Sequence, residues 1–251
     1  MRLVDIVRGL RETELIYWSD SYLRTFQAAV LRVEKEKKRR VYIVLDRTGF
    51  HPKSGGQPSD TGTIHNKNFA VKINKAMFTR GVVVHWGKLL EGSPEEGTTI
   101  TGEISWEPRY LFMRRHTAGH LLDHCLTEVC GGSVETTDSW LGDPCYVGYK
   151  GKPPSGELVK GAEVLCNRMI AEGASVRVEV VSHEELLRRA PEAPNIYRLP
   201  QLDSYRVVTI EGCDPIPCGG CHLKNVKEIR RFSIRDVVPA ENGYRVYYDV
   251  A

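Results

Sequence analysis

The residue pattern of this chain changes at residues 107–108, and this change constrains the fold more than any other feature. Before it, short runs of β-branched and aromatic residues alternate with turn residues. After it, apolar residues recur at the three- and four-residue spacing of an amphipathic helix. We therefore place a domain boundary near residue 106, which divides the chain into regions 1–106 and 107–251.

The first region is expected to form a small β-barrel or sandwich, because many short strands with frequent turns are typical of both. The expected strands cover residues 15–18, 28–33, 41–45, 69–73, 82–84 and 98–104. Between two of these strands, residues 35–40 carry a run of charges. We expect a solvated hairpin tip there, and the alternative is a secondary contact with phosphate groups.

The second region is expected to be an α+β domain. Pro108 suits the first turn of a helix that reaches about residue 129 and stops at Gly131 and Gly132. A second helix is expected at residues 156–172, and strands are expected at residues 176–181, 205–210, 228–238 and 244–248. Strands with a few helices packed against them give the fold class α+β.

Composition excludes several classes of protein. The 251 residues are 41% hydrophobic and 27% charged, which suits one large or two small globular domains. The net charge of +3 is too small for a surface coated in basic residues. No apolar run is long enough to cross a membrane, and the first residues do not resemble a secretory signal. Seven cysteines, an odd number, predict reduced thiols in the cytoplasm and favour metal or redox chemistry over disulfides.

Two histidines in the expected long helix are candidate metal ligands. His116 and His120 are four residues apart, so their imidazoles project from one face and can reach one ion. The alternative is a histidine pair that binds no metal and makes ordinary hydrogen bonds in the core or at the surface, because such a pair can have the same spacing. His124 continues it, so spacing alone leaves open which pair is used.

A second group of candidate ligands lies a hundred residues further on. Cys218 and His222 supply a thiolate and an imidazole, and the glycines between them allow a tight loop. Together with two histidines, this set suits zinc better than calcium or magnesium. A redox pair made by Cys218 and Cys221 is the alternative, but no thioredoxin-like βαβ pattern surrounds it. A metalloprotease is disfavoured, because Thr117 stands where such enzymes have glutamate.

Three motifs in this order resemble the editing domain of alanyl-tRNA synthetases and its free-standing relatives, the medium-length AlaX proteins. They are a glycine-rich segment at residues 46–62, His-Thr-Ala-x-His-Leu-Leu at residues 116–122 and Cys-Gly-Gly-x-His at residues 218–222. With the flanking strands, the resemblance covers nearly the whole chain. The departures are His51 in place of an aromatic residue, Ser54 within the glycine run, and Cys221 where the synthetases commonly have threonine.

The resemblance implies a fold, a metal and a reaction. It implies a small N-terminal β-barrel that carries the glycine-rich motif, followed by a two-layer α/β editing domain. It also implies one Zn²⁺ per chain. The chain is too short to contain an adenylation domain as well, so it should deacylate tRNA(Ala) mischarged with serine or glycine and never charge it. The implied zinc ligands are His116, His120, Cys218 and His222.

The substrate of such an enzyme sets a selectivity problem. Serine exceeds alanine by one hydroxyl, so the site must recognise this hydroxyl by a hydrogen bond. Aligning the histidine motifs without a gap makes Thr137 the expected discriminating residue, with Thr136 as the choice if the alignment slips by one. Gly55, Gly56 and Gln57 are expected to close over the aminoacyl group, or else to form an ordinary glycine turn.

Two questions remain open at the level of sequence. Zinc could activate a bound water or hold the substrate while an unbound water attacks. The chain could also be a zinc-stabilised RNA-binding module without catalysis. The motif residues near the metal helix favour the hydrolase.

Overall fold

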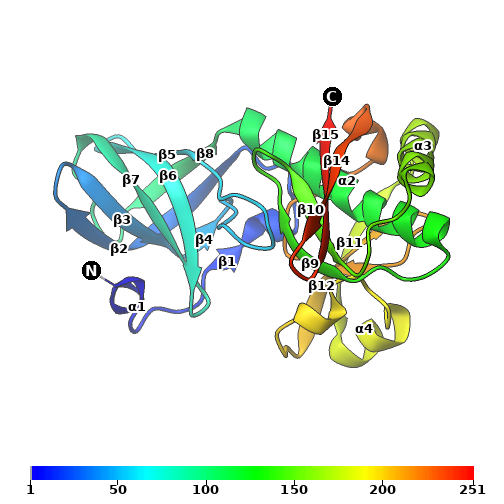
Figure 1. Ribbon diagram of the computed structural model, residues 1–251. Coiled ribbons are helices and arrows are strands. Elements are labelled where there is room, and N and C mark those ends of the chain that lie inside the picture. Colours follow the sequence, from blue (N-terminus) through cyan, green and yellow to red (C-terminus); the bar gives the residue numbers. More distant parts are fainter. Residues whose placement is uncertain (1) are drawn as a thin grey trace. The chain divides into compact units, whose positions relative to one another are not determined.

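The computed structural model describes residues 2–251, which form two compact units (Figure 1). One unit comprises residues 1–54 and 58–111, and the other comprises residues 55–57 and 112–251. Three residues of the glycine-rich segment, Gly55, Gly56 and Gln57, therefore pack with the second unit. Among the described residues, no helix is long and apolar enough to span a membrane.

The first unit is built on a closed six-stranded barrel, as expected for the α+β class with an N-terminal barrel. Its strand order is β2-β3-β7-β6-β5-β8, and all of these pairings are antiparallel. The barrel strands are β2 (Thr25–Glu36), β3 (Arg40–Leu45), β5 (Gly62–His65), β6 (Phe69–Thr79), β7 (Val82–Gly92) and β8 (Thr99–Ile104). Outside the barrel lie α1 (Leu3–Ile6), β1 (Glu14–Leu15), η1 (Ile16–Trp18) and β4 (Arg47–Thr48).

Alternating burial explains why these segments close into a barrel. In β2, Phe26, Ala28 and Val30 are buried, while the residues between them are exposed or half-buried. The inward side chains join one apolar cluster that also contains residues of β3, β5, β6, β7 and β8. This cluster fills the barrel with side chains.

The second unit has two sheets and two long helices. The sheets have the orders β14-β15-β10-β9 and β11-β12-β13. The strands are β9 (Thr136–Trp140), β10 (Tyr146–Lys150), β11 (Val176–Ser182), β12 (Ser204–Ile210), β13 (Ile216–Pro217), β14 (Phe232–Ala240) and β15 (Gly243–Val250). The helices are α2 (Trp106–Cys130), α3 (Gly156–Glu172), α4 (His183–Arg189), η2 (Ile196–Arg198) and η3 (Val226–Ile229).

Helices α2 and α3 have clear local causes. Pro108 lies in the first turn of α2, where a missing backbone N–H costs little. Ser155 caps the N-terminus of α3 and accepts a hydrogen bond from the backbone N–H of Leu158 (3.4 Å). Gly173 ends α3 with a left-handed φ of 90°.

Helix α2 packs on the four-stranded sheet. Tyr248 of β15 donates a hydrogen bond to the carbonyl of Arg115 (2.8 Å), and Tyr149 of β10 donates one to Asp123 (2.7 Å). A Cβ on Gly119 would lie only 2.9 Å from the Tyr248 hydroxyl, so the glycine allows the close approach.

Two segments expected as strands differ in the structure. Of residues 15–18, only Leu15 is in a strand, and the rest form the 3₁₀ turn η1, which Ser19 closes by bonding the carbonyl of Ile16 (2.9 Å). The expected strand 228–238 begins only at Phe232. Asn225 caps η3 by accepting from the backbone N–H of Lys227 (2.9 Å), so the preceding residues turn.

A candidate metal centre

The cluster begins on helix α2. His116 and His120 are one turn apart, and their ring centroids are 5.2 Å from each other. Both side chains are buried. Helical periodicity alone accounts for this half of the site.

The other half is a short loop that follows β13. Arg206 of β12 holds this loop by donating to the carbonyl oxygens of Cys218 (2.7 Å) and Gly220 (2.9 Å). A Cβ on Gly220 would lie 2.1 Å from Cε1 of His116, so only glycine lets the loop approach the helix this closely. The loop thereby brings Cys218 and His222 to the two helix histidines.

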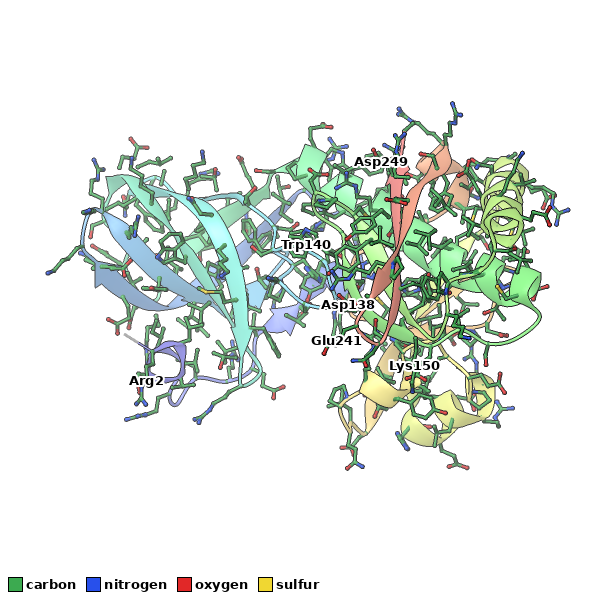
Figure 2. All side chains as sticks on the ribbon, viewed as in Figure 1. Arg2, Asp138, Trp140, Lys150, Glu241 and Asp249 are labelled. Atoms are coloured by element: carbon green, nitrogen blue, oxygen red, sulfur yellow. The ribbon has the colours of Figure 1, made fainter. Side chains whose placement is uncertain are left out.

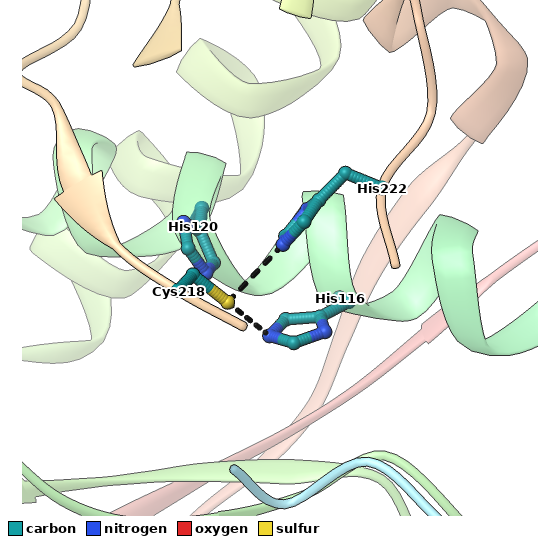
Figure 3. A group of neighbouring side chains, drawn as sticks. All are labelled: His116, His120, Cys218 and His222. Atoms are coloured by element: carbon teal, nitrogen blue, oxygen red, sulfur yellow. Dashed lines mark hydrogen bonds between the residues drawn. The ribbon is translucent and has the colours of Figure 1, made fainter. Parts of the chain in front are cut away.

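The four side chains converge on one point (Figure 3). The ligand atoms of His116, His120, Cys218 and His222 all lie within 4.8 Å of one another. Sγ of Cys218 is 3.3 Å from Nε2 of His116 and 3.3 Å from Nε2 of His222. Such a set of three imidazoles and one thiol could hold a metal ion.

A second layer of polar groups fixes two of the imidazole rings. Nδ1 of His116 lies 2.9 Å from Oε1 of Gln57, and Nδ1 of His222 lies 3.2 Å from Oγ1 of Thr117. When these Nδ1 atoms carry the proton, each Nε2 presents a lone pair to the centre of the cluster. Metal-binding histidines are commonly oriented in this way.

Burial shifts the pKa values of two cluster residues in opposite directions. It lowers the pKa of His120 to about 4, so this imidazole is neutral at pH 7. It also raises the pKa of the Cys218 thiol to about 11, although the backbone N–H of Gly220 and the charge of Arg206 oppose the shift. A metal ion would displace the thiol proton and supply the positive charge that a buried thiolate needs.

The glycine-rich loop reaches the metal cluster through Gln57. This side chain is fully buried, and its Oε1 also accepts a hydrogen bond from the backbone N–H of Cys221 (3.1 Å). That bond fixes the amide orientation and leaves Nε2 buried, with no partner among the described residues. Cys221 thus contributes its backbone, whereas Cys218 contributes the sulfur of the cluster.

Gly55 and Gly56 give this loop its shape. Both have positive φ values, of 53° and 78°, which glycine adopts without strain. A Cβ on Gly56 would lie 2.2 Å from Oγ of Ser139 in β9. The backbone N–H of Leu141 donates to the carbonyl of Gly56 (2.9 Å), so the loop is attached to the end of β9.

The two threonines at the start of β9 point in opposite directions. Thr136 pairs with Tyr149, so it shares the sheet face that packs on α2. Its buried hydroxyl donates to the carbonyl of Pro194 (2.9 Å) and accepts from Arg198 (2.6 Å). Thr137 is exposed on the other face and donates to Asp138 (3.0 Å), which is labelled in Figure 2. The structure therefore brings Thr136, and not Thr137, to the helix side of β9.

Sequence reasoning missed three residues of this region. Asp123 follows His120 by three residues on α2, and this spacing could have revealed it. Thr117 served in the sequence analysis only to argue against a metalloprotease, but in the structure its hydroxyl contacts Nδ1 of His222 and orients that ring. Arg206 carried no local signal, because its role depends on how β12 meets the loop after β13.

Comparisons with known families agree with this architecture. A family model described as "tRNA synthetases class II (A)" matches residues 10–108. A second model, described as "Threonyl and Alanyl tRNA synthetase second additional domain", matches residues 205–247. The second match contains Cys218 and His222. The two matches thus relate the chain to domains of aminoacyl-tRNA synthetases.

Similar proteins show the family to which the chain belongs. It is 33% identical to the alanyl-tRNA editing protein AlaX-M of Methanosarcina mazei, over 95% of this chain and 96% of that protein. It is 32% identical to AlaX-L of Pyrococcus horikoshii, covering 86% of this chain and 52% of that protein. The alanine–tRNA ligase of Pyrobaculum calidifontis is 32% identical over 94% of this chain and 26% of that protein. The chain belongs to the family of alanyl-tRNA editing proteins.

Proposed function

We propose that this protein hydrolyses the ester of serine, and that of glycine, with the terminal ribose of tRNA(Ala). The observation that carries the proposal is the convergence of four ligand atoms within 4.8 Å beside the buried amide of Gln57. The names of the relatives, alanyl-tRNA editing proteins, support it. An aminoacyl ester is activated, so its hydrolysis does not require a strong nucleophilic triad.

The proposed cofactor is one zinc ion per chain. His116, His120, Cys218 and His222 would hold it, since neutral imidazoles and a thiolate are preferred zinc ligands. A bound zinc ion would act as a Lewis acid, either on a water or on the ester. The buried Nδ1 of His120, which has no hydrogen-bond partner among the described residues, fits a site in which the ring is held by an ion.

Gln57 is proposed to act directly on the ester. Its Oε1 is held by His116 and by the backbone N–H of Cys221, so its Nε2 has a fixed direction. This N–H donor is already desolvated, so donating to the oxygen that gains negative charge during attack costs no reorganisation. Gly55 and Gly56 are proposed to bind the aminoacyl group beside it, because their lack of side chains leaves the backbone accessible.

The selectivity for serine is proposed to depend on a threonine of β9. The sequence alignment predicted Thr137 for this role, and Thr136 was the alternative if the alignment slips by one position. The face of β9 favours Thr136, because its hydroxyl lies on the side of α2 and bonds both Pro194 and Arg198. A threonine hydroxyl can donate to or accept from the hydroxyl of a serine substrate.

The two regions are proposed to divide the work: residues 107–251, together with Gly55, Gly56 and Gln57 of the glycine-rich segment, perform hydrolysis, and the rest of residues 1–106 contributes to tRNA binding. The expected hairpin tip of the barrel lies between β2 and β3, where Lys38 and Arg39 have positive φ. Arg40 stacks over Trp86, with 5.1 Å between the guanidinium carbon and the ring centroid. Lys35, Lys37 and Lys38, the lysines of this hairpin tip, are exposed and could approach phosphate groups. A location in the cytoplasm, where tRNA is charged, stays a prediction.

A deacylation assay tests the proposal against a non-catalytic RNA-binding module. Purified protein is incubated with tRNA(Ala) charged with serine, glycine or alanine, and the loss of each amino acid is followed. We expect rapid loss of serine, loss of glycine and little loss of alanine. Gln57→Ala should retain bound zinc and lose about 10²–10³-fold in rate. Binding of tRNA without hydrolysis would favour the RNA-binding module.

A further inference from the structure

A cavity of about 210 Å³ lies beside the metal cluster in the second unit. His120 belongs to both, so the cavity and the cluster share one wall. Helix α2 supplies the rest of that wall, and β12, β13 and the segments at residues 192–194 and 212–214 supply the others. The volume suits a group the size of one amino acid.

The cavity has a strongly acidic lining. Four carboxylates face it, and neither lysine nor arginine occurs among the lining residues that the structure describes. These carboxylates are Asp123, Glu128, Glu192 and Asp214. A cavity with this lining favours a cation.

The arrangement of the carboxylates argues against a bare divalent ion. Such an ion needs several oxygen atoms that converge on one point. Among residues 2–251, three or more possible ligand atoms converge only in the group of three histidines and Cys218. A cation that brings its own hydrogen-bond donors, such as a primary ammonium, requires no such convergence.

Asp123 is the carboxylate best placed to receive an ammonium. Its side chain is buried, and Tyr149 donates to Oδ1 (2.7 Å), which orients the carboxylate and leaves Oδ2 for a ligand. Burial raises the pKa of Asp123 to about 7, although the hydrogen bond from Tyr149 and the charge of Arg198 oppose the shift, so a further cation beside Asp123 would stabilise its ionised form.

The distances suit an amino acid ester that spans the cluster and the cavity. Along a helix, His120 and Asp123 are separated by a rise of about 4.5 Å on one face. In an amino acid ester, the amino nitrogen and the carbonyl carbon are about 2.5 Å apart, given the lengths of the two intervening bonds. An ester carbonyl at the cluster would therefore place its amino group within reach of Asp123.

We infer that this cavity binds the α-ammonium group of the aminoacyl ester, with Asp123 as its acceptor. The inference rests on the proposed hydrolase function and extends it. It predicts that the enzyme requires a free amino group and spares esters whose nitrogen is acylated, such as peptidyl-tRNA. Tyr149 is a positioning residue in this scheme, since it contacts Asp123 and not the substrate.

The kinetic test compares Ser-tRNA(Ala) with N-acetyl-Ser-tRNA(Ala), in which the positive charge is removed. Wild-type protein should hydrolyse the free amine at least tenfold faster. Asp123→Asn should lower kcat/KM for the free amine about ten- to hundredfold, as expected for a lost charge-assisted hydrogen bond, and should leave the acetylated substrate nearly unchanged. Tyr149→Phe should give a smaller loss with the same preference. The exposed Asp203→Asn is the matched control and should behave as wild type.

Two results would overturn the inference: equal rates for both substrates in wild type, or equal losses on both in Asp123→Asn. A binding experiment separates this failure from failure of the hydrolase proposal. Serinamide and N-acetylserinamide, which are stable amides, are titrated into the zinc-loaded protein and followed by NMR. Preferential binding of serinamide that Asp123→Asn abolishes would support the ammonium site even if no tRNA ester were hydrolysed. Equal binding of both amides would contradict it.

Discussion

The two units bury polar side chains in different ways. In the barrel unit, Arg109 is fully buried, and it donates to Asp60 and to the carbonyl oxygens of Ser21 and Gly49. His85, in the barrel interior, contacts Oγ1 of Thr48 (2.8 Å) and the carbonyl of Ile43 (3.0 Å). These polar groups have protein partners and surround an apolar cluster, so they hold the backbone in place.

In the second unit, two buried polar atoms at the metal cluster have no hydrogen-bond partner among the described residues. They are Nε2 of Gln57 and Nδ1 of His120. A desolvated donor without a partner costs free energy, which a folded protein tolerates where a ligand completes the bond. The buried polar groups of Arg109 and His85 therefore stabilise the fold, whereas the two atoms at the metal cluster are available to a ligand.

The largest expected effect concerns the metal cluster. Purified protein should contain about one zinc per chain, from the single four-ligand group. Cys218→Ala should lose most of this zinc and, with it, ester hydrolysis. Cys221→Ala should retain both, because the backbone of Cys221 rather than its sulfur contacts Gln57. Metal analysis of both variants is the measurement, and loss of zinc from Cys221→Ala alone would reverse our ligand assignment.

The next effect tests the barrel side of the comparison. Asp60→Asn should leave the fully buried Arg109 without its ion partner, which costs about 3–5 kcal/mol of unfolding free energy. As a control, Arg188→Met removes an exposed partner of Glu185 and should change stability by less than about 1 kcal/mol. Urea unfolding followed by circular dichroism measures both. Lower zinc content in Asp60→Asn protein that is still folded would mean that the pair serves the site as well.

A smaller effect is expected from the pH dependence of stability. Burial lowers the pKa of His85 to about 4, against about 6.5 in the unfolded chain. Below pH 6.5 the unfolded chain takes up a proton that the folded protein does not, so His85 should cost roughly 2 kcal/mol of stability between pH 7 and pH 5. Burial raises the pKa of Asp123, so the folded protein takes up a proton at Asp123 as the pH falls. Asp123 therefore changes the stability in the opposite direction to His85.

His85→Gln isolates the contribution of the histidine. The variant removes the titrating ring and leaves Asp123 unchanged, so its stability should fall by about 2 kcal/mol less than that of wild type between the two pH values. Denaturant unfolding at pH 7 and pH 5 measures the difference. Parallel pH profiles would show that the ring of His85 is not the desolvated group that the structure indicates.

The smallest effect concerns selectivity. Thr136→Val keeps the shape of the side chain and removes its hydroxyl, so the ratio of serine to glycine ester hydrolysis should fall by on the order of fivefold, about 1 kcal/mol. Thr137→Val should leave this ratio unchanged, because its hydroxyl lies on the other face of β9. The opposite result would restore the ungapped assignment to Thr137. Equal losses on both esters would instead assign Thr136 to holding Pro194 and Arg198.

Much of the fold follows from local patterns. Helix α3 (Gly156–Glu172) has its expected bounds, since Ser155 and Gly173 supply local start and stop signals. The barrel was expected from strand spacing and from the resemblance, and it is confirmed. Strands β5, β9 and β10 and helix α4 were missed. Strand β9 (Thr136–Trp140) is polar, β5 and β10 are short and contain glycine, and α4 is short. For such segments, pairing with neighbouring strands overrides weak local propensity.

The sequence by itself determined the parts of the site that local spacing or motif order encodes. Two histidines four apart share a helix face in any helix, and the motif at residues 218–222 contains its ligands within five residues. The tertiary structure alone decided which atoms meet. It selected the face of Thr136, attached Gln57 to His116 and enclosed Asp123 beside His120. These relations depend on contacts between strands and loops far apart in the chain, and no local periodicity records such contacts.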